Sequence, residues 1–394
     1  MSYGYLLDLA FILLSTKILS LVTKRFKLPQ VVGALLAGLI LGPAVFNVIA
    51  ETDFIKQLAE LGVIVLLFTA GLESNLSEFK KSGKTSFIVA TMGVIIPLIG
   101  GTILAYCIND GKVGNVNIFV QNIFIGSVLT ATSVSITVET LRELGKVSTS
   151  VGNIIVGAAI IDDVLGMLVL TVITSLADSS VSVVMVVVKI VAFFIFSVIV
   201  GIITYKLFNK WVDKYDIDKR RFVIVSFVIC LLLSFSAEKF FGVADITGAY
   251  IAGLVLSSNK ETIYITKRFE TLSYILLSPV FFASVGLNVK LPYLNGEIVM
   301  VTIALIIVAV LTKIIGCGLG AKLCGYNNME AIQIGSGMVT RGEVTLIIAS
   351  KGLTLGLISS YFLAPIIIMV VFTSIFTPIL LKIVFSRDKS SVQC

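Results

Sequence analysis

The chain has 394 residues, of which 57% are hydrophobic and 13% are charged, with a formal net charge of +7 and a mean hydropathy of +1.06. Soluble domains carry about a quarter of charged residues, so this composition excludes an ordinary soluble protein. The short alternating segments of a membrane β-barrel do not occur in the sequence, which leaves an all-α polytopic membrane protein. Because the chain contains no histidine, any proton chemistry must use carboxylates or lysines.

The first apolar stretch (6–22) has no basic region before it and no small-residue cleavage site after it, so we expect a retained helix and not a signal peptide. The cysteines match no metal-binding spacing and form no disulfide framework; they are Cys107, Cys230, Cys317, Cys324 and Cys394. The positive net charge is interpreted as loop charge that sets membrane orientation, and no nucleic-acid partner is expected.

Hydropathy and turn signals predict about thirteen membrane spans joined by short loops. The predicted spans are 4–22, 29–48, 57–74, 86–107, 118–140, 150–176, 182–207, 221–237, 242–258, 271–288, 298–323, 331–351 and 357–384. Lysines and arginines concentrate in alternate loops, the first of which contains Lys24, Arg25 and Lys27. The positive-inside rule therefore places the N-terminus outside the cell membrane and the C-terminus in the cytoplasm.

The two halves of the chain share an internal repeat. The segment VVGALLAGLIL (31–41) matches ITGAYIAGLVL (246–256), a shift of 215 residues from 31 to 246. The same shift aligns LFTAGLESNL (67–76) with FASVGLNVKL (282–291). Because an odd number of spans separates the copies, they cross the membrane in opposite senses. Inverted repeats of six helices are typical of secondary transporters, whose substrate site lies near the membrane midplane.

Two adjacent acids, Asp162 and Asp163, lie near the middle of the sixth span. A charge at the centre of a membrane helix costs about 2.5–3.5 kcal/mol, which favours a functional role. The alternative is a pair of helix-capping acids, although no helix end is predicted there. Successive residues point in directions about 100° apart, so the two acids need not share one partner.

Lys313 lies in the middle of the eleventh span, too far from either end to reach water easily. A buried lysine either loses its proton or pairs with a carboxylate, and the Asp pair supplies candidates. The alternative is a snorkelling lysine in a tilted helix. Two acids and one base would leave one carboxylate for a small cation or a proton.

The fifth and twelfth spans occupy matching places in the two repeats, and both contain residues suited to a helix break. The hydroxyl residues of the fifth span are Ser127, Thr130, Thr132, Ser133, Ser135 and Thr137, and the glycines of the twelfth are Gly335, Gly337 and Gly342. Paired discontinuous helices at matching positions indicate an ion site, and hydroxyls that serve only helix packing are the alternative.

Other polar or small residues at membrane depth have plainer interpretations. For Arg341 and Glu343, also in the twelfth span, a structural ion-pair role weighs at least as much as direct transport chemistry. Glu73, Glu139 and Asp245 lie near span ends and are interpreted as interfacial acids. Gly38 and Gly253 are interpreted as helix-packing residues.

Together these motifs resemble the Kef/NapA-type branch of the monovalent cation:proton antiporters, family 2. The resemblance rests on KLPQVVGALLAGLILGP (27–43), LGVIVLLFTAGLE (61–73), the Asp162–Asp163 pair, SPVFFASVGL (278–287) and Lys313. It covers nearly the whole chain, from about 5 to 384. The chain departs from the large Kef proteins because no C-terminal nucleotide-binding domain follows the spans.

The resemblance implies a thirteen-helix antiporter fold with crossed discontinuous helices, and a homodimer. In family members with two aspartates the first pairs with the lysine and the second binds the ion, so Asp162 would pair with Lys313 and Asp163 would take Na⁺ or H⁺, with Asp162 beside it. The implied parts are scaffold helices (1–85 and 211–290), core helices (86–176 and 291–384), a linker helix (177–210) and a cytoplasmic tail (385–394).

The sequence thus predicts a transporter and not an enzyme. We expect exchange of Na⁺, or Li⁺ or K⁺, for H⁺ by alternating access, with no cofactor and with lipid, monovalent cations and a second subunit as partners. A K⁺/H⁺ antiporter is the nearest alternative. A sodium-coupled solute symporter or a passive channel is less favoured, because neither needs two adjacent acids and a lysine inside the membrane.

Overall fold

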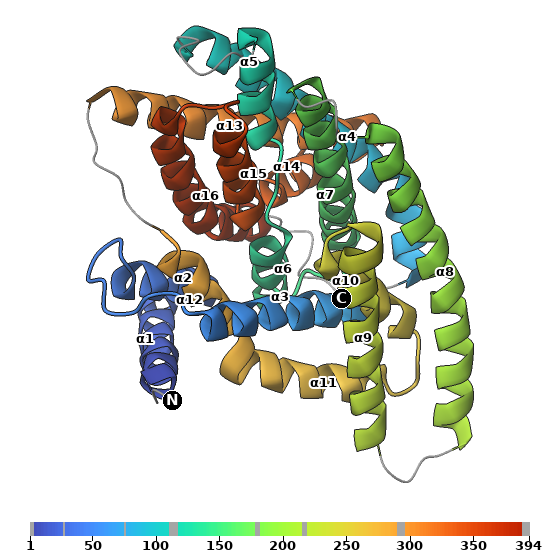
Figure 1. The fold of residues 1–394 in the computed structure, drawn as a ribbon. Coiled ribbons are helices and arrows are strands. Elements are labelled where there is room, and N and C mark those ends of the chain that lie inside the picture. The colour runs from blue at the N-terminus through green and yellow to red at the C-terminus, as the bar shows by residue number, and fades with distance from the viewer. Residues whose placement is uncertain are drawn as a thin grey trace.

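The computed structural model describes residues 4–26, 28–74, 76–109, 117–177, 182–214, 219–289 and 296–387. Every regular element in those ranges is helical, which confirms the all-α prediction (Figure 1). The helices pack in several orientations, so the short connections bring segments that are distant in sequence side by side. The membrane-spanning interpretation follows from the length and apolar composition of these helices.

The first half of the chain forms seven helices before a long linker helix. They are α1 (Gly4–Arg25), α2 (Gln30–Leu41), α3 (Asp53–Glu73), α4 (Leu76–Ile108), α5 (Ile118–Val128), α6 (Val134–Glu143) and α7 (Ser150–Ala177), followed by α8 (Val183–Lys214). The chain breaks between α5 and α6 instead of forming one continuous fifth span.

The second half follows a parallel order. Its elements are α9 (Arg220–Phe241), α10 (Asp245–Leu256), α11 (Thr262–Leu272), the π-helix η1 (Ser273–Leu277), α12 (Ser278–Leu287), α13 (Gly296–Leu323), α14 (Asn328–Gly337), α15 (Glu343–Thr354) and α16 (Ser360–Ser386). A second break separates α14 from α15, at the place that corresponds to the α5–α6 break.

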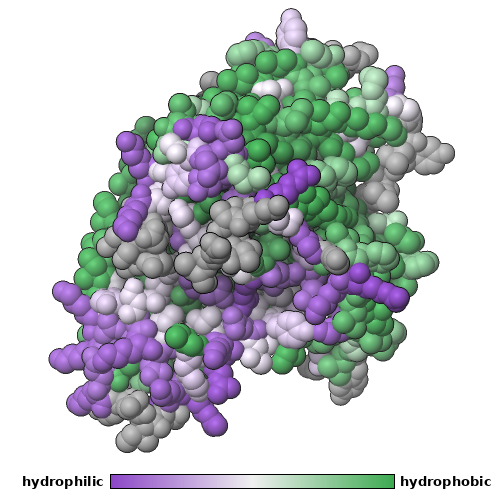
Figure 2. Space-filling view, turned by 180° about the vertical axis from the view of Figure 1, so that it is seen from behind, coloured by the Kyte–Doolittle hydropathy of each residue, from purple (hydrophilic) through white to green (hydrophobic). Residues whose placement is uncertain are grey.

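In the described ranges, nine helices are long and apolar enough to cross a membrane, and four shorter apolar helices accompany them. The exact number of thirteen spans stays a prediction. Side chains on the outer faces are strongly apolar; Val184, on α8, is 73% exposed. Figure 2 shows a broad hydrophobic surface over the upper part of the view, with hydrophilic residues gathered at the lower left and across the middle. Such a surface suits contact with lipid.

The helices form two packed groups. In the first group, α4 packs against α13, α5 and α7, and α16 packs against α13 and α14. In the second group, α2 packs against α1 and α12, and α10 packs against α3 and α9. Contacts of α6 with α3 and of α16 with α2 join the groups, so the breaks in α5–α6 and α14–α15 lie beside the boundary between them.

Two glycine contacts show why the small residues occur where they do. A Cβ on Gly38 would strike the Ala283 backbone, and one on Gly286 would lie 2.7 Å from the carbonyl carbon of Gly38. Likewise, a Cβ on Gly253 would lie 2.9 Å from Gly71 Cα. The glycines of α2 and α10 are therefore helix-packing residues, as predicted. The two contacts are related by the same shift of 215 residues, from 38 to 253 and from 71 to 286.

Several boundaries differ from the predicted ones because a helix need not end where its apolar segment ends. Helix α4 begins at Leu76, whereas the fourth span was predicted to begin at 86. Helix α8 continues to Lys214, whereas the seventh span was predicted to end at 207. Helix α2 ends at Leu41, whereas the second span was predicted to end at 48. Gly42 and Pro43, which follow Leu41, end the helix. The tenth predicted span begins at Thr262 instead of 271, because the charged helix α11 continues through η1 into the apolar helix α12.

Candidate functional site

The two predicted acids lie on α7, which is unbroken through this region. Asp162 is 1% exposed, whereas Asp163 is half-buried. Because neighbouring residues of a helix diverge, Asp162 faces the packed interior while Asp163 faces a less enclosed environment. The two carboxylates are therefore chemically different although they are adjacent in sequence.

Asp162 forms a buried ion pair with Lys313. The Lys313 ammonium, on α13, donates to Asp162 Oδ1 at 2.8 Å, and its side chain is 0% exposed. In the described part of the chain, Asp162 Oδ2 has no hydrogen-bond partner. A pair this deeply buried must gain enough attraction to offset the desolvation of both charges. The remaining oxygen of Asp162 gives the site an acceptor that the protein itself leaves unused.

A glycine on α4 lets that helix approach the ion pair. A Cβ on Gly93 would lie 2.5 Å from Cys317 Sγ, 3.4 Å from Lys313 Nζ and 3.7 Å from Asp162 Oδ1. Cys317 lies one turn after Lys313 on α13 and is fully buried. Gly93, for which no role was predicted, therefore closes one side of the ion pair with bare backbone.

The two breaks cross each other next to this pair. The Ser133 N–H donates to the Thr340 carbonyl at 2.8 Å, which joins the stretch after α5 to the stretch after α14. The Thr137 hydroxyl donates to the Gly337 carbonyl at 2.8 Å and lies 3.0 Å from Thr340 Oγ1. Hydroxyl groups thus satisfy backbone carbonyls that the interrupted helices leave open.

The predicted break residues have distinct positions. The Thr130 hydroxyl donates to the Ser127 carbonyl at 2.7 Å, and Ser133 Oγ lies 3.4 Å from Ser135 Oγ. Gly335 packs against α13, where a Cβ would lie 2.6 Å from the Ile314 carbonyl oxygen. A Cβ on Gly337 would likewise lie 2.8 Å from the Ile155 side chain. These glycines serve close packing and do not use the left-handed backbone conformation.

Arg341 lies in the second break and is completely buried. Its guanidinium donates to the Ala131 carbonyl at 2.8 Å and contacts Thr132 Oγ1 at 3.4 Å. Among the described residues, the acceptors of its hydrogen bonds are the neutral oxygens of Ala131, Thr132 and Ala309. Glu343 begins α15, and its side chain lies outside the described part of the structure.

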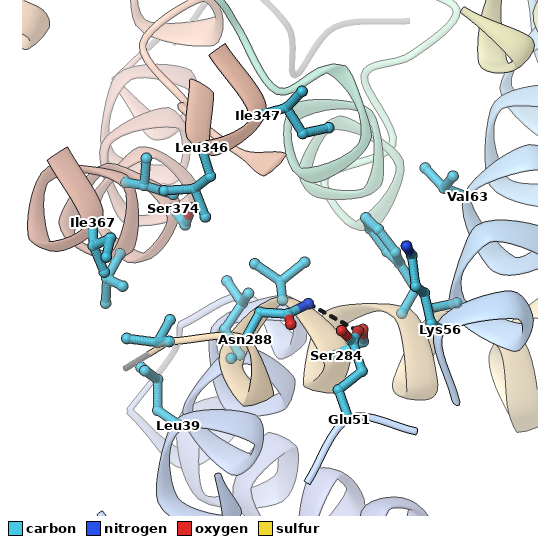
Figure 3. Close-up of a pocket in the computed structure, with 18 of the residues that line it drawn as sticks. Leu39, Glu51, Lys56, Val63, Ser284, Asn288, Leu346, Ile347, Ile367 and Ser374 are labelled. Atoms are coloured by element: carbon cyan, nitrogen blue, oxygen red, sulfur yellow. Dashed lines mark hydrogen bonds between the residues drawn. The ribbon is translucent and has the colours of Figure 1, made fainter. Parts of the chain in front are cut away.

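A cavity of about 390 Å³ lies between the two helix groups (Figure 3). Its walls come from α2, α3 and α12 on one side and from α15 and α16 on the other. Glu51, at its edge, accepts hydrogen bonds from Ser284 at 2.5 Å and Asn288 at 2.8 Å. Ser374, on the opposite wall, donates to the Arg341 carbonyl at 2.9 Å, so this wall directly supports the second break.

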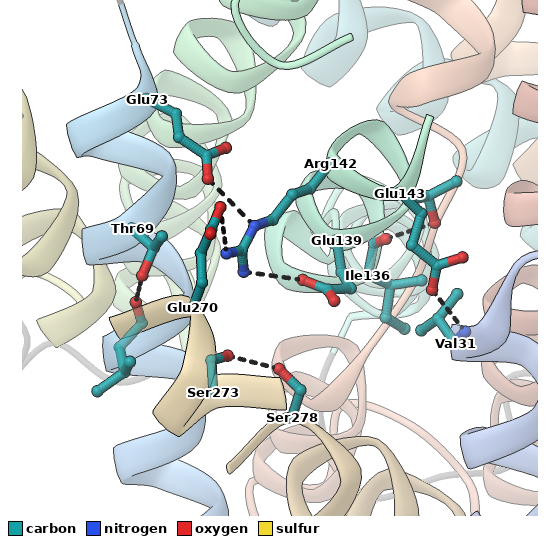
Figure 4. Close-up of polar contacts among 12 residues, drawn as sticks. Val31, Thr69, Glu73, Ile136, Glu139, Arg142, Glu143, Glu270, Ser273 and Ser278 are labelled. Atoms are coloured by element: carbon teal, nitrogen blue, oxygen red, sulfur yellow. Dashed lines mark hydrogen bonds and ion pairs between the residues drawn. The ribbon is translucent and has the colours of Figure 1, made fainter. Parts of the chain in front are cut away.

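A second polar cluster was not predicted, because two of its members, Glu73 and Glu139, were interpreted singly as interfacial acids. Arg142, on α6, lies 3.2 Å from Glu73 and 3.3 Å from Glu270, and 3.8 Å from Glu139 on its own helix (Figure 4). These contacts tie α6 to α3 and α11. The i, i+3 spacing of Glu139 and Arg142 was the one signal available in sequence.

The last residue of α6 also reaches another helix. Glu143 accepts from the Gln30 N–H at 2.7 Å and the Val31 N–H at 3.0 Å, at the start of α2 (Figure 4). Pro29, at the N-cap of α2, makes no side-chain capping bond. A carboxylate at a helix N-terminus satisfies free N–H groups and interacts favourably with the helix dipole. Asp245, by contrast, lies in the first turn of α10 and accepts from the N–H of the next residue, Ile246.

A helical membrane protein with a buried acid–lysine pair at crossed helix breaks has the architecture of a secondary transporter. The family model described as sodium/hydrogen exchanger, transmembrane, matches residues 10–387, and the chain belongs to this family. The predicted membership of the monovalent cation:proton antiporters is thereby confirmed.

Curated relatives match along almost their whole length. The chain is 36% identical to the Na⁺/H⁺-K⁺ antiporter GerN of Bacillus cereus, covering 99% of each chain. It is 34% identical to a Na⁺/H⁺ antiporter of Enterococcus hirae, covering 95% of this chain and 96% of the relative. It is 30% identical to the high-affinity Na⁺/H⁺ antiporter NhaS3 of Synechocystis, covering 98% and 91%.

Solved structures show the same fold. The sodium proton antiporter MjNhaP1 of Methanocaldococcus jannaschii superimposes with a TM-score of 0.72 at 18% identity, covering 100% of both chains. Its structure at pH 8 gives a TM-score of 0.67 at 20% identity, covering 96% of this chain and 95% of that one. The predicted antiporter fold is confirmed at the level of overall architecture.

Proposed function

We propose that this protein is a secondary antiporter that exchanges Na⁺ for H⁺ across a membrane. The observation that carries the proposal is the buried Asp162–Lys313 pair, with half-buried Asp163 beside it, at the crossing of two helix breaks. The relatives named as Na⁺/H⁺ antiporters, which match nearly end to end, support the same activity.

The exchange follows from competition for one carboxylate site. Asp163 binds either a proton or a monovalent cation, and entry of one displaces the other because both need the same carboxylate charge. Lys313 holds Asp162 in place through the buried ion pair, and the other oxygen of Asp162 contributes to the same site. If the Asp162–Lys313 pair also gained and lost a proton in each cycle, two protons would exchange for one Na⁺ and one net charge would move, so the membrane potential would contribute about 2.3 kcal/mol per 100 mV.

Potassium is the second candidate cargo. The relative GerN is named a Na⁺/H⁺-K⁺ antiporter, which supports K⁺ as an alternative or additional ion. A sodium-coupled solute symporter is the remaining alternative. It is less well supported, because an acid–lysine pair buried at the crossing suits stoichiometric competition between small cations.

Alternating access would move one helix group against the other. The core is proposed to consist of α4–α7 and α13–α16, the scaffold of α1–α3 and α9–α12, and α8 links them. The cavity between α12 and α16 supplies an approach to the crossing from one side. We propose a homodimer formed through the scaffold, in the cell's inner membrane, with the N-terminus outside and the C-terminus in the cytoplasm.

The assignment of Asp163 is tested with the purified protein in proteoliposomes that carry an imposed pH gradient. Asp163→Asn removes the titrating charge while keeping the side-chain size, and we expect Na⁺-dependent dissipation of the gradient to fall at least about tenfold, as for a site that loses its only exchangeable charge. Asp53→Asn makes the same chemical change at an exposed position in the first turn of α3 and should leave transport unchanged.

Retained Na⁺-dependent proton movement in Asp163→Asn would reject Asp163 as the cargo ligand. The same vesicles, given Na⁺, K⁺ or Li⁺ with and without a potential clamp, separate the alternatives. A response to K⁺ alone would replace the Na⁺/H⁺ assignment with K⁺/H⁺ exchange. Dissipation that required an organic solute would instead establish symport.

A further inference from the structure

Each helix break is followed by a short half-helix, and both half-helices carry a basic residue at the same position. Helix α6 begins at Val134 and α15 begins at Glu343, and the ninth residue of each is basic: Arg142 in α6 and Lys351 in α15. Because the repeats are inverted, the two half-helices run from the crossing toward opposite sides of the membrane. The same charge is therefore present once on each side.

The two half-helices have different surroundings. Helix α6 packs against α2 and α3, and Arg142 lies 3.2 Å from Glu73 and 3.3 Å from Glu270 (Figure 4). Helix α15 instead packs against α5 and α16 of its own group, and the cavity of about 390 Å³ lies between it and α2, α3 and α12 (Figure 3). Lys351 is exposed. One side of the crossing is thus closed by ion pairs, and the other is open.

The facing wall of the cavity supplies a carboxylate at the matching place. The shift of 215 residues that relates the repeats places Asn288 at the position of Glu73. Asn288 donates to the Glu51 carboxylate at 2.8 Å, and Ser284, one turn before it, donates to the same carboxylate at 2.5 Å. On one side the acid is Glu73 itself, and on the other side these two residues hold Glu51 in its place.

The charges around the cavity lie on one wall. Glu51, Lys56 and Glu60 belong to the wall formed with α2, α3 and α12. In the described ranges, the lining from α15 and α16 contains no charged residue, and Lys351 directly follows the lining residue Ser350. Lys351 is therefore the base that closure of this cavity would bring toward the acids of the facing wall.

This inference deepens the proposed function and rests on it. We propose that Lys351 is a positioning residue that closes the outer side of the transporter. When the core moves to open the inner side, Arg142 leaves Glu73 and Glu270, and Lys351 reaches Glu51. The two ion pairs alternate, so the loss of one is offset by formation of the other. Both states then stay populated, which repeated exchange needs.

The test reports on closure of the cavity in right-side-out membrane vesicles. Ile367→Cys places a thiol on the α16 wall, and its modification by a membrane-impermeant maleimide is followed by mass spectrometry of the labelled peptide, which separates it from the native cysteines. Arg142→Gln weakens the inner ion pairs, so we expect labelling of residue 367 to slow about threefold, as for the loss of a partly exposed ion pair.

Addition of Lys351→Gln to the Arg142→Gln background removes the outer pair as well and should restore labelling to near the wild-type rate. Lys351→Arg keeps the charge, so in that background labelling should stay slow. Lys56→Gln is the matched control, because it removes a positive charge from the same cavity but on the other wall, and it should also leave labelling slow. Glu73→Gln weakens the inner pair from the scaffold side and provides a second background.

Unchanged labelling in both Arg142→Gln and Glu73→Gln would overturn the proposal. So would labelling that stays slow after Lys351→Gln is added, or that Lys56→Gln restores equally. In proteoliposomes, Lys351→Gln should lower the maximal rate of Na⁺-dependent exchange about threefold while the KM for Na⁺ stays within about twofold of wild type. A wild type without Na⁺-driven exchange would reject the proposed function, whereas the labelling rates decide the alternation of the ion pairs independently.

Discussion

At the scale of single residues, the buried pair of Asp162 and Lys313 has the largest consequence for stability. Both side chains are essentially inaccessible, so neither can replace its partner with water. Breaking such a pair on one side leaves an uncompensated charge, whereas removing both charges leaves none. The stability of the single and double variants should therefore differ in a characteristic way.

We expect Lys313→Met to lower the free energy of unfolding by about 3–5 kcal/mol, because Asp162 then remains buried without its counter-ion. The double variant Asp162→Leu/Lys313→Met should recover most of that loss, although it should not transport. Thermal unfolding in detergent measures both. Equal stability of the single and double variants would show that the pair is not maintained as ions in the folded protein.

At the scale of elements, the glycine contacts set how closely the helices approach. Gly253 on α10 meets α3 backbone directly, and Gly286 on α12 meets α2 in the same manner. Inside a membrane, association of helices depends on such close packing, because burial away from lipid supplies little hydrophobic driving force. A single methyl group at these positions must push two helices apart.

Gly253→Ala should therefore lower the melting temperature by several degrees, as expected for an overpacked contact that costs about 1–3 kcal/mol. Gly166→Ala on α7 is the control, because an added Cβ there meets nothing within 4 Å. In that open position alanine should be neutral or slightly stabilising. Equal destabilisation by the two changes would show that helix propensity, and not close approach, dominates at Gly253.

At the scale of the whole molecule, α6 joins the two helix groups through charge. Arg142 contacts Glu73 and Glu270 on α3 and α11, and Glu143 caps α2. Relative movement of the groups would have to break these contacts. The present arrangement is therefore stabilised by an ionic connection that does not involve the transport pair.

Replacing Arg142 by methionine should loosen this connection. We expect faster amide hydrogen exchange in α6 and in the first turn of α2, because the partly buried carboxylates lose their shared cation. Lys260→Met is the control, since it removes an exposed ion pair with Asp213, which is 57% exposed, and such pairs contribute about 0–1 kcal/mol. Exchange in α6 that stayed at the wild-type rate would argue against a connecting role.

The scales also differ in how far the sequence predicts the structure. Asp162, Lys313 and the crossed breaks could be found because charges and helix-breaking residues inside apolar segments are unfavourable and therefore conspicuous. The Arg142 cluster could not, because each member lies near the end of an apolar segment, where an acid is ordinary. The cluster is recognised only from contacts between residues far apart in the chain, such as Glu73 and Arg142, which are 69 residues apart.

Boundaries were harder to predict for a related reason. The apolar pattern reports where lipid begins, whereas a helix continues as long as its backbone bonds are satisfied. Helix α11 carries Lys267 and Arg268 and still leads through η1 into α12, so hydropathy placed the start of this span too late. The contacts of Arg341 were equally inaccessible, because its acceptors are carbonyl oxygens, which no residue pattern reveals.

The capping of α2 has a consequence for biosynthesis. Its first N–H groups bind Glu143, which lies 113 residues after Gln30 along the chain. During synthesis, α2 therefore emerges well before the carboxylate that completes it. Its first turn must stay frayed, or bonded to water and lipid head groups, until α6 has been made and has folded against it. The first turn of α2 therefore gains its side-chain hydrogen bonds only after α6 has been synthesised and has packed against it.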